Sequence, residues 1–326
     1  MSQVLFQFND VVALINKGKS LILAGDEKVL KKLPQGNWIA GTIPYFMGEK
    51  GGEFSQEKIF VTQVPSYALS TSIQVYDEKS ISNVYSDIDG NTLGISIIPG
   101  FSKTHTTFAL NAPHFDQYAF SPLIGWISGV DLKELGSISP KVFDGRSAKA
   151  FENSAVVMHV KFPTNILIEL GIINLFKDGT GDEIEFLESS FSAKEALVNG
   201  KKVHYATYCK EKNMNVKLPL VANYSGAMIN TSFQKLGDDQ VDFYAPVFKG
   251  LKYHQAADIG DYASQFKKTI NLDPDSLFFT CNCILNYLYG ELENKATNKI
   301  TGPITFGEIA YQLLNQTLAY AKISEV

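Results

Sequence analysis

Along the first part of the chain, segments with the apolar spacing of a helix are followed by segments with the apolar pattern of a strand. Residues 8–17 have apolar positions at helical spacing, and the glycine that follows ends the pattern. The short apolar run at 20–24 predicts a buried strand, 26–33 predicts a second helix, and 38–43 predicts a second strand. This order of helix, strand, helix and strand is typical of α/β proteins.

The same spacings continue to the end of the sequence and predict a mixed fold. Further helices are expected at residues 101–113, 259–269 and 284–292. Asn199-Gly200 is a strong turn signal between two short strands, and 228–234 with 241–247 predicts an antiparallel hairpin. Additional strands are expected at residues 59–64, 68–76, 93–98, 156–162, 184–187, 276–280, 304–308 and 317–323. The fold class is therefore predicted as α/β (mixed α+β), with mixed sheets flanked by helices.

A length of 326 residues suggests two domains at about 150 residues each. We predict an α/β domain over residues 1–150 and a second α/β domain over 151–326. The Gly-Ser-Ile-Ser-Pro stretch at 136–140 is the best candidate for the linker.

Composition and charge narrow the partners that this chain is expected to have. The formal net charge is −5 and no basic run occurs, so nucleic acid is not expected as a main partner. The N-terminus has no signal-peptide pattern, and no apolar run of about 18 to 20 residues predicts a membrane span. Three cysteines do not form a disulfide framework, so a cytoplasmic protein is expected.

The most informative local feature is the stretch Thr280-Cys281-Asn282-Cys283, between a predicted strand and a predicted helix. Such a turn lies at the carboxyl edge of a sheet, where α/β folds bind ligands. Asn282 is expected to cap the helix or present its amide to a ligand. A thiol at Cys281, beside a helix N-terminus, would have a lowered pKa, although both cysteines also fit as small buried residues.

A second candidate region precedes the Gly51-Gly52 turn. The predicted strand over 38–43 leads through Gly41 into an aromatic turn that contains Tyr45. Gly41 allows the backbone to approach a ligand or another strand closely. Tyr45 is expected to stack on a ligand or hydrogen-bond to it, with a core-packed aromatic turn as the alternative.

The other residues of the sequence form no recognisable catalytic or cofactor-binding motif, and the cofactor is left as unknown. The five histidines show no metal-ligand spacing, although one histidine beside aromatic residues could ligate haem iron. Cys281 and Cys283 lack the further ligands that a zinc site needs. The Gly/Asp-rich stretch at 177–182 predicts a tight turn rather than a complete calcium loop.

Several ordered motifs resemble the FIST family of sensory domains. The resemblance is strongest over 303–309 with 314–318, which is similar to the end of a FIST C-terminal domain. Phe278–Asn282 is similar to the family's strand with its Cys-Asn turn, and 197–208 resembles its Asn-Gly turn. Residues 39–48 are a shorter match to the N-terminal domain.

The FIST resemblance implies a cytoplasmic sensory module that binds a small ligand, and some members are similar to haem-dependent nitric oxide sensors. The chain departs from the family where an Arg often follows the cysteine turn, since Cys283-Ile284-Leu285 stands there. The class of ligand is therefore left open. With no kinase, cyclase or receiver segment apparent, output is expected to need a signalling protein partner.

Three functional hypotheses follow. In the first, Cys281, Asn282, Glu308, Tyr45 and Gly41 contribute to a ligand-binding pocket between the domains, with Glu308 as a carboxylate for a ligand amine. In the second, the protein is an enzyme with Cys281 as nucleophile and Glu308 as its acid/base partner. In the third, a histidine holds haem in a gas sensor. The first is preferred, and the protein is not expected to be an enzyme.

Overall fold

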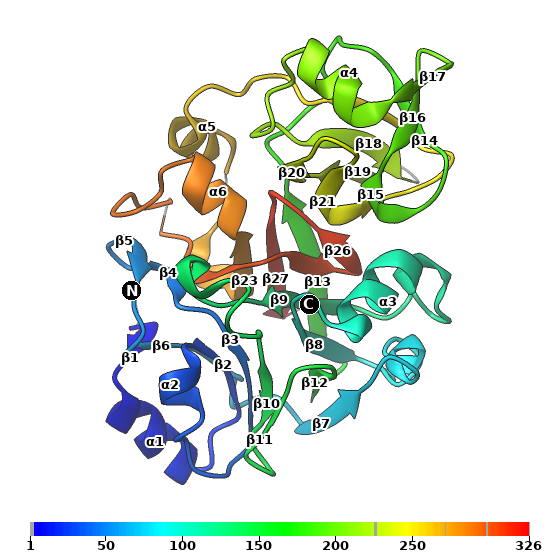
Figure 1. Ribbon diagram of the computed structural model, residues 1–326. Coiled ribbons are helices and arrows are strands. Elements are labelled where there is room, and N and C mark those ends of the chain that lie inside the picture. Colours follow the sequence, from blue (N-terminus) through cyan, green and yellow to red (C-terminus); the bar gives the residue numbers. More distant parts are fainter. Residues whose placement is uncertain (1–2, 225–226, 271, 298, 326) are drawn as a thin grey trace.

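The computed structural model describes residues 3–224, 227–270, 272–297 and 299–325. The described strands form four six-stranded sheets and one three-stranded sheet, with short helices against them. Figure 1 shows a lower body, which carries the N-terminal and C-terminal segments, and a smaller upper lobe in green and yellow. The predicted mixed α/β class is confirmed.

The N-terminal sheet lies at the bottom of the lower body (Figure 1). Two helices, α1 (Phe8–Asn16) and α2 (Glu27–Leu30), pack on one face of it. The strands follow the order β1 (Leu5–Phe6), β6 (Ile59–Gln63), β2 (Leu21–Gly25), β3 (Trp38–Thr42), β10 (Val142–Asp144) and β11 (Lys149–Phe151).

The central sheet packs against the other face of the N-terminal sheet, and helix α3 (Lys103–Asn111) covers its far side. The lower body is therefore layered as helix, sheet, sheet and helix, and strands buried on both faces explain their continuous apolar runs. The strands of the central sheet follow the order β26 (Gln312–Leu314), β25 (Glu308–Ala310), β9 (Leu123–Ser128), β8 (Thr92–Pro99), β12 (Ala155–Lys161) and β7 (Ser70–Tyr76).

The C-terminal sheet joins segments from both ends of the chain and carries helices α5 (Tyr262–Thr269) and α6 (Ile284–Tyr289). Its strands follow the order β13 (Ile166–Ile173), β27 (Leu318–Glu325), β23 (Leu277–Cys283), β24 (Gly302–Thr305), β4 (Tyr45–Gly48) and β5 (Gly51–Phe54). The ring of Trp126 on β9 stacks on Phe279 on β23 with centroids 5.7 Å apart, so this sheet packs on the central one.

The upper lobe is built from the remaining two sheets and helix α4 (Tyr205–Glu211). Its six-stranded sheet has the order β17 (Lys201–His204), β16 (Glu195–Val198), β14 (Ile184–Phe186), β22 (Lys252–Gln255), β18 (Leu220–Tyr224) and β19 (Ala227–Thr231). Its three-stranded sheet has the order β15 (Ser190–Ala193), β21 (Val241–Val247) and β20 (Phe233–Leu236).

Of the two hairpins predicted in this lobe, one is confirmed and the other is present only in part. Asn199 and Gly200 join β16 to β17 with φ angles of 50° and 77°, as expected for a two-residue hairpin turn. The second hairpin is formed by β20 and β21, which pair antiparallel, but its first strand was misplaced: most of residues 228–234 belongs to β19, which pairs with β18.

Three strand pairs in the described structure are parallel, and a helix connects each of them. These pairs are β2 with β3, β8 with β9, and β23 with β24, and the helices are α2, α3 and α6. Each pair therefore has a strand-to-helix junction at a carboxyl edge, which is where ligands bind in α/β folds. None of the helices among the described residues is long and apolar enough to cross a membrane.

The central and C-terminal sheets both run across the proposed boundary at residue 150. The central sheet contains β8 and β9 from before it and β12 and β25 from after it, and the C-terminal sheet pairs β4 with β24. The division into residues 1–150 and 151–326 stays a prediction, because strand pairing alone does not define folding units.

The predicted aromatic turn around Tyr45 is wrong. Residues Tyr45–Gly48 form β4, which pairs with β5 and β24, and the actual turn follows at Glu49 and Lys50. All four residues of this strand are buried, so the continuous apolar character of the stretch was a strand signal.

Gly41 allows the close approach of two strands, which was one of its two predicted roles. A Cβ atom at this position would lie 2.5 Å from Cγ2 of Ile97 and 2.9 Å from Nε1 of Trp126. Both of those side chains are fully buried in the central sheet. The glycine therefore sets the spacing between the N-terminal and central sheets.

We expect Gly41→Ala to lower the free energy of unfolding by about 1–3 kcal/mol, because a methyl group would overpack this interface. Gly181→Ala is the matched control, since no atom lies within 4 Å of its Cβ position and its φ is outside the left-handed region. Urea unfolding of both variants measures the difference. Equal stability of the two would contradict the role of Gly41 in sheet packing.

Candidate functional site

The predicted turn at Cys281 and Asn282 is part of a strand. Strand β23 extends to Cys283, and α6 begins directly after it with Cys283 as its N-terminal cap residue. Asn282 does not cap the helix; its Oδ1 accepts hydrogen bonds from the Cys283 amide and from Nδ2 of Asn286. The predicted strand-to-helix junction is present, but its side chains are buried within it.

The expected lowering of the Cys281 pKa is wrong. Burial raises the pKa of the Cys281 thiol well above its ordinary value, and the nearby Glu308 acts in the same direction. The thiol is fully buried and its Sγ donates to the carbonyl oxygen of Gly125 on β9, 3.2 Å away. The structure therefore gives Cys281 the environment of a packed thiol rather than of a nucleophile.

Glu308 lies at the start of β25 and is fully buried. Its Oε2 accepts hydrogen bonds from the hydroxyl and the amide of Thr317, at 2.7 and 3.2 Å. Burial raises the pKa of Glu308 to about 8, although Thr317 and the thiol of Cys283 lower it in part. At neutral pH the group is therefore mostly a neutral carboxylic acid, not the carboxylate that was expected to meet a ligand amine.

Only part of the predicted site comes together. Glu308 acts electrostatically on Cys281 and Cys283, so these residues form one buried cluster. Tyr45 makes other contacts: its hydroxyl donates to Oδ1 of Asp131 at 3.1 Å and accepts from the amide of Leu132. Burial raises the pKa of Tyr45 to about 12. A ligand-binding role for the five predicted residues stays a prediction.

A cavity of about 40 Å³ lies beside this cluster, between two strand-to-helix junctions. The β8-to-α3 junction contributes Gly100, Phe101 and His105, and α6 contributes three aliphatic side chains from the β23-to-α6 junction. The complete lining consists of Gly100, Phe101, His105, Ile127, Leu132, Leu135, Tyr244, Ile284, Leu285, Leu288, Phe306 and Asn315. The lining contains no Asp, Glu, Lys or Arg.

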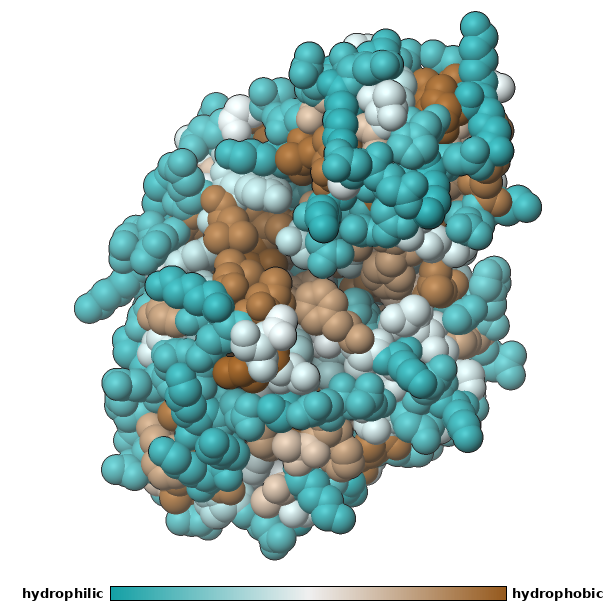
Figure 2. Space-filling view, in the orientation of Figure 1, coloured by the Kyte–Doolittle hydropathy of each residue, from teal (hydrophilic) through white to brown (hydrophobic). Residues whose placement is uncertain are grey.

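The mouth of the cavity is apolar and open to solvent. Phe101, Leu135 and Leu288 are exposed, which is unusual for three large apolar side chains that line one cavity. Figure 2 shows hydrophobic side chains gathered in the middle of the front face, where the upper lobe meets the lower body. An apolar ligand could extend from the cavity onto this surface.

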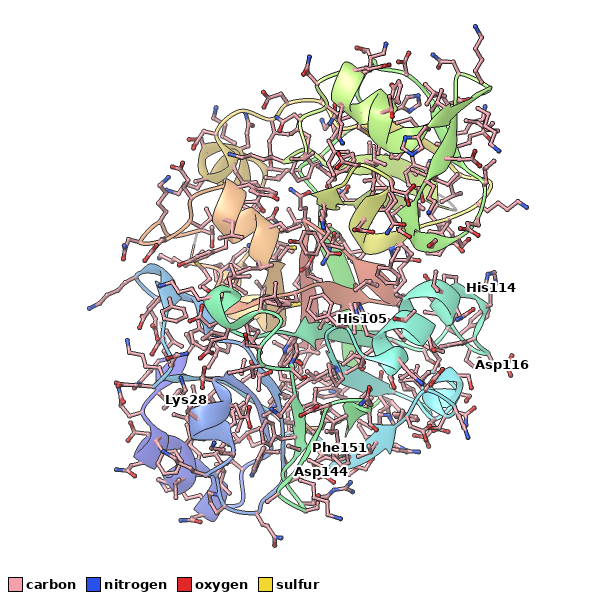
Figure 3. All side chains as sticks on the ribbon, in the orientation of Figure 1. Lys28, His105, His114, Asp116, Asp144 and Phe151 are labelled. Carbon is pink, nitrogen blue, oxygen red and sulfur yellow. The ribbon has the colours of Figure 1, made fainter. Side chains whose placement is uncertain are left out.

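His105 is a polar side chain in the cavity wall, and its contacts determine its protonation state. It is 6% exposed, and Figure 3 places it near the middle of the molecule, with His114 farther out. Its Nδ1 accepts a hydrogen bond from the amide of Phe101 at 3.2 Å, so the proton of the neutral ring is on Nε2. Burial lowers the pKa of His105 to about 4, which keeps the ring neutral at pH 7.

Two side chains in the cavity wall have hydrogen-bonding atoms without a partner. The Nε2–H of His105 is buried and has no acceptor within the described structure. Asn315 is 1% exposed, and neither its Oδ1 nor its Nδ2 has a partner there. Leaving such a group unpaired inside a protein costs about 1–3 kcal/mol.

The backbone at the cavity mouth is also strained. Phe101 has a φ of 64°, in the left-handed region that a residue with a bulky side chain rarely adopts. The hydrogen bond from its amide to His105 and the cap of α3 by Ser102 hold it there. Strain of this kind is concentrated at functional sites.

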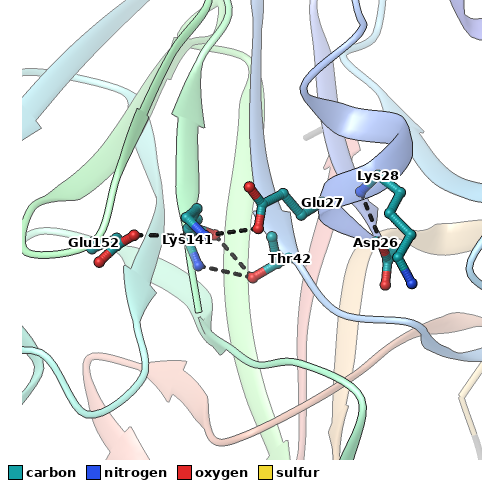
Figure 4. Close-up of polar contacts among 6 residues, drawn as sticks. All are labelled: Asp26, Glu27, Lys28, Thr42, Lys141 and Glu152. Atoms are coloured by element: carbon teal, nitrogen blue, oxygen red, sulfur yellow. Dashed lines mark hydrogen bonds and ion pairs between the residues drawn. The ribbon is translucent and has the colours of Figure 1, made fainter. Parts of the chain in front are cut away.

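The loop that carries Leu132 and Leu135 is anchored at its far end by Lys141. The Nζ of Lys141 lies 2.7 Å from Oε2 of Glu27 and 3.5 Å from Oε1 of Glu152. Its backbone amide and carbonyl both bond to the hydroxyl of Thr42, as Figure 4 shows. These contacts fix the loop to β3 and so hold one wall of the cavity.

Other hollows on the surface lack these features. A groove of about 540 Å³ runs between β6 and β23, and another of about 390 Å³ adjoins the cavity through Gly100, Phe101 and Leu135. Among the described residues, no buried polar atom without a partner belongs to the lining of either groove. The cavity at His105 is therefore the better candidate site.

The structure gives little support to a metal or haem site. No group of three or more His, Cys, Asp or Glu side chains in the described part of the chain could hold a metal ion. His105 is in the cavity wall, but its Nε2 carries a proton and so offers no lone pair to iron.

Sequence reasoning identified one of the two junctions and missed the other. The strand over 93–98, the Pro99-Gly100 stop and the helix with His105 were all expected, but they were not recognised as a carboxyl edge. The signal was the apolar run followed directly by a helix, the same pattern that drew attention to Cys281. Asn315 gave no local signal, because its position depends on pairing between distant strands.

We expect Glu308→Gln to flatten the dependence of stability on pH. Between about pH 4.5 and 8 the unfolded chain loses the Glu308 proton while the folded chain keeps it, so stability falls as pH rises. The neutral amide removes this contribution. Urea unfolding from pH 4 to 9, with exposed Glu188→Gln as control, measures the slope. An unchanged slope in Glu308→Gln would show that the carboxyl group titrates normally.

Comparison with known families covers almost the whole chain. The model described as "Family of unknown function (DUF6976)" matches residues 6–324. No curated protein matches the chain. The family description assigns no activity and does not mention FIST domains, so that resemblance stays a prediction. On the basis of this match, the chain belongs to DUF6976, a family of unknown function.

Proposed function

We propose that this protein is a small-ligand-binding sensory protein and that the ligand binds in the cavity at His105. The observation that carries the proposal is an apolar cavity with an open mouth, whose wall includes two buried polar side chains, His105 and Asn315. Ligand pockets typically combine apolar walls with a few polar groups that fix orientation.

The segment Asn315-Gln316-Thr317, here called the connector, offers a route from the cavity to the upper lobe. It joins β26 to β27, and Asn315 contributes its side chain to the cavity. Gln316 accepts a hydrogen bond from Ser232 at 2.6 Å and donates to the carbonyl oxygen of Lys217 at 3.2 Å. Asn230 donates to the carbonyl oxygen of Asn315 at 3.0 Å.

The connector is also tied to the lower body. Thr317 binds Glu308, and its carbonyl oxygen accepts hydrogen bonds from the Cys283 amide and from Asn286 on α6. A ligand that displaces Asn315 would therefore displace a segment that contacts both the upper lobe and the lower body. We propose that occupancy changes the upper lobe and that a signalling protein partner reads this change.

The two alternative functions have less support. A Cys281-dependent enzyme would need an accessible thiolate, whereas the thiol is fully buried and has a raised pKa. A haem sensor would need room for the macrocycle and a lone pair on a histidine, whereas the cavity is about 40 Å³ and Nε2 of His105 is protonated. We further propose a cytoplasmic location, in keeping with three free, buried cysteines.

A thermal-shift screen of small neutral and charged metabolites tests the proposal, with Leu288→Trp as the variant that blocks the mouth. Leu288 is 42% exposed, so the larger side chain can be tolerated on the surface while it covers the cavity. We expect compounds that stabilise the wild type, by about 2.7 kcal/mol at a hundred times Kd, to lose this effect in Leu288→Trp.

Leu187→Trp is the matched control for the screen. Leu187 is 40% exposed and follows β14 in the upper lobe, outside the lining of the cavity. Hits should be retained in this variant. Hits that survive equally in Leu288→Trp, or a screen without any hit, would count against binding at the cavity.

Hydrogen exchange tests whether the connector transmits occupancy. With a stabilising compound bound, we expect slower amide exchange at Gln316 and Thr317 and, in the upper lobe, at Asn230 and Ser232. Gln316→Ala removes the side-chain bonds to Ser232 and Lys217 and should reduce the change in the upper lobe, where the bond from Asn230 to the Asn315 carbonyl oxygen remains. Changes confined to the cavity in the wild type would rule out transmission through the connector.

A further inference from the structure

We infer that strand β13 (Ile166–Ile173) pairs antiparallel with the same strand of a second copy of this chain, around a two-fold axis at Leu170. Strand β13 forms one edge of the C-terminal sheet and lies beside β27, as Figure 1 shows. Among the described strands, β27 is its single neighbour, so its other edge presents a template for a further strand. No residue of β13 lines the His105 cavity, so the inference does not depend on the proposed function.

Strand β13 lacks the features by which edge strands usually avoid such pairing. Natural edges are protected by short length, lysine, proline or a bulge. This strand has eight residues in unbroken register with β27, contains neither lysine nor proline, and has Glu169 as its one charged residue. The other outer strands of the described sheets have two to five residues, except for the seven-residue and mainly polar β7.

The hydrogen bonding of the sheet determines which main-chain groups of β13 point outward. The Cys283 amide donates to the carbonyl oxygen of Thr317, and the groups of successive residues in a strand point alternately to either side. Residues 318, 320 and 322 of β27 therefore bond to β13, where they lie opposite 173, 171 and 169. The N–H and C=O groups of Ile168, Leu170 and Ile172 consequently point away from β27, and no described residue bonds to them.

These free groups select one register for a symmetric pair. With Leu170 opposite Leu170 of the second copy, Ile168 lies opposite Ile172, and all three residues can donate and accept across the axis. Moving the axis to Glu169 would place Ile172 opposite Ile166, whose amide and carbonyl oxygen already have partners. The register with the axis at Leu170 is therefore the one that satisfies every free group of the edge.

Charge selects the same register. An axis at Glu169 would place this carboxylate opposite its own copy, and like charges directly opposite one another are destabilising. With the axis at Leu170, Glu169 lies opposite Gly171 instead. Its Oε2 is also 3.6 Å from Nζ of Lys322 on β27, so each copy brings its own compensating charge to the interface.

The pair would also cover the two apolar side chains that β13 leaves exposed. Leu167 and Ile172 are both exposed, and they lie on opposite faces of the strand. In the register at Leu170, Ile172 lies beside Ile168 of the second copy and Leu167 lies beside Ile173. Apolar cross-strand pairs of this kind stabilise antiparallel sheets. The two C-terminal sheets would then form one continuous sheet.

Sedimentation velocity over a range of protein concentrations tests the association. We expect the wild type to sediment as a monomer at low concentration and as a dimer at high concentration. Ile172→Lys should raise the dissociation constant about tenfold or more, because it places an ammonium group opposite Ile168. Leu187→Lys is the matched control, since Leu187 is similarly exposed but lies in the upper lobe, and it should dimerise like the wild type.

Paired cysteines test the register. Leu167 and Ile173 of the second copy would lie at a non-hydrogen-bonded position, where Cα atoms are about 4.5 Å apart and a disulfide can form. The double variant Leu167→Cys with Ile173→Cys should therefore give covalent dimers with oxidised glutathione. Either single variant should not, because its two cysteines would be about 20 Å apart across the axis. The three native cysteines are buried.

Amide hydrogen exchange provides a readout that needs no variant. As the concentration of the wild type rises, exchange should slow at Ile168, Leu170 and Ile172. It should change little at Glu169 and Gly171, whose amides already bond to β27. A dimer that forms without protecting these three amides would overturn the inference. A monomer at every concentration up to the millimolar range would also overturn it, and would leave the edge for an extended segment of another protein.

Discussion

Two hydrogen bonds from Thr317 to Glu308 hold the segment on which the arrangement of the molecule depends. They join the start of β25 in the central sheet to the start of β27 in the C-terminal sheet. The acid is neutral because it is buried without a cation, so the pair is stabilised as a neutral contact rather than as an ion pair. From this point the connector reaches the upper lobe through Gln316 and the cavity through Asn315.

The position of the cavity follows from the layering of the fold. Parallel pairs β8/β9 and β23/β24 each end in a strand-to-helix junction, and the packing of the two sheets brings these junctions together. The shared edge is not filled completely, and Gly100 and Phe101, whose backbone is left-handed, line the space beside His105. A site built in this way has walls from both sheets.

Local sequence patterns were sufficient for most of the elements. The runs at 20–24 and 93–98 are buried on both faces and form β2 and β8 close to their expected limits, and Asn199-Gly200 specifies its hairpin turn. The length of the apolar run, the glycine beside it and its apolar content identify such a segment as a buried strand. The fold class could be predicted because these signals alternate along the chain.

The site could be predicted only in part, because its chemistry depends on burial. The sequence shows that Cys281 precedes a helix, but it does not show that a second sheet covers the thiol and raises its pKa. Glu308 looks like a carboxylate until its desolvation is known. The tautomer of His105 depends on a backbone bend at Phe101, which no local preference of phenylalanine predicts.

The order of strands in the C-terminal sheet has a consequence for how the chain is made. Strand β27 lies between β13 and β23. Strand β4 can pair with β24 only after β24 has been synthesised, because the partner residues Met47 and Gly302 are far apart in sequence. Contacts of this range slow folding, since a long loop must close before any pairing stabilises it. During synthesis, Tyr45–Gly48 and Ile166–Ile173 leave the ribosome with open edges. The edge of β4 therefore stays unpaired until residues 302–305 have emerged, and that of β13 until residues 318–325 have emerged.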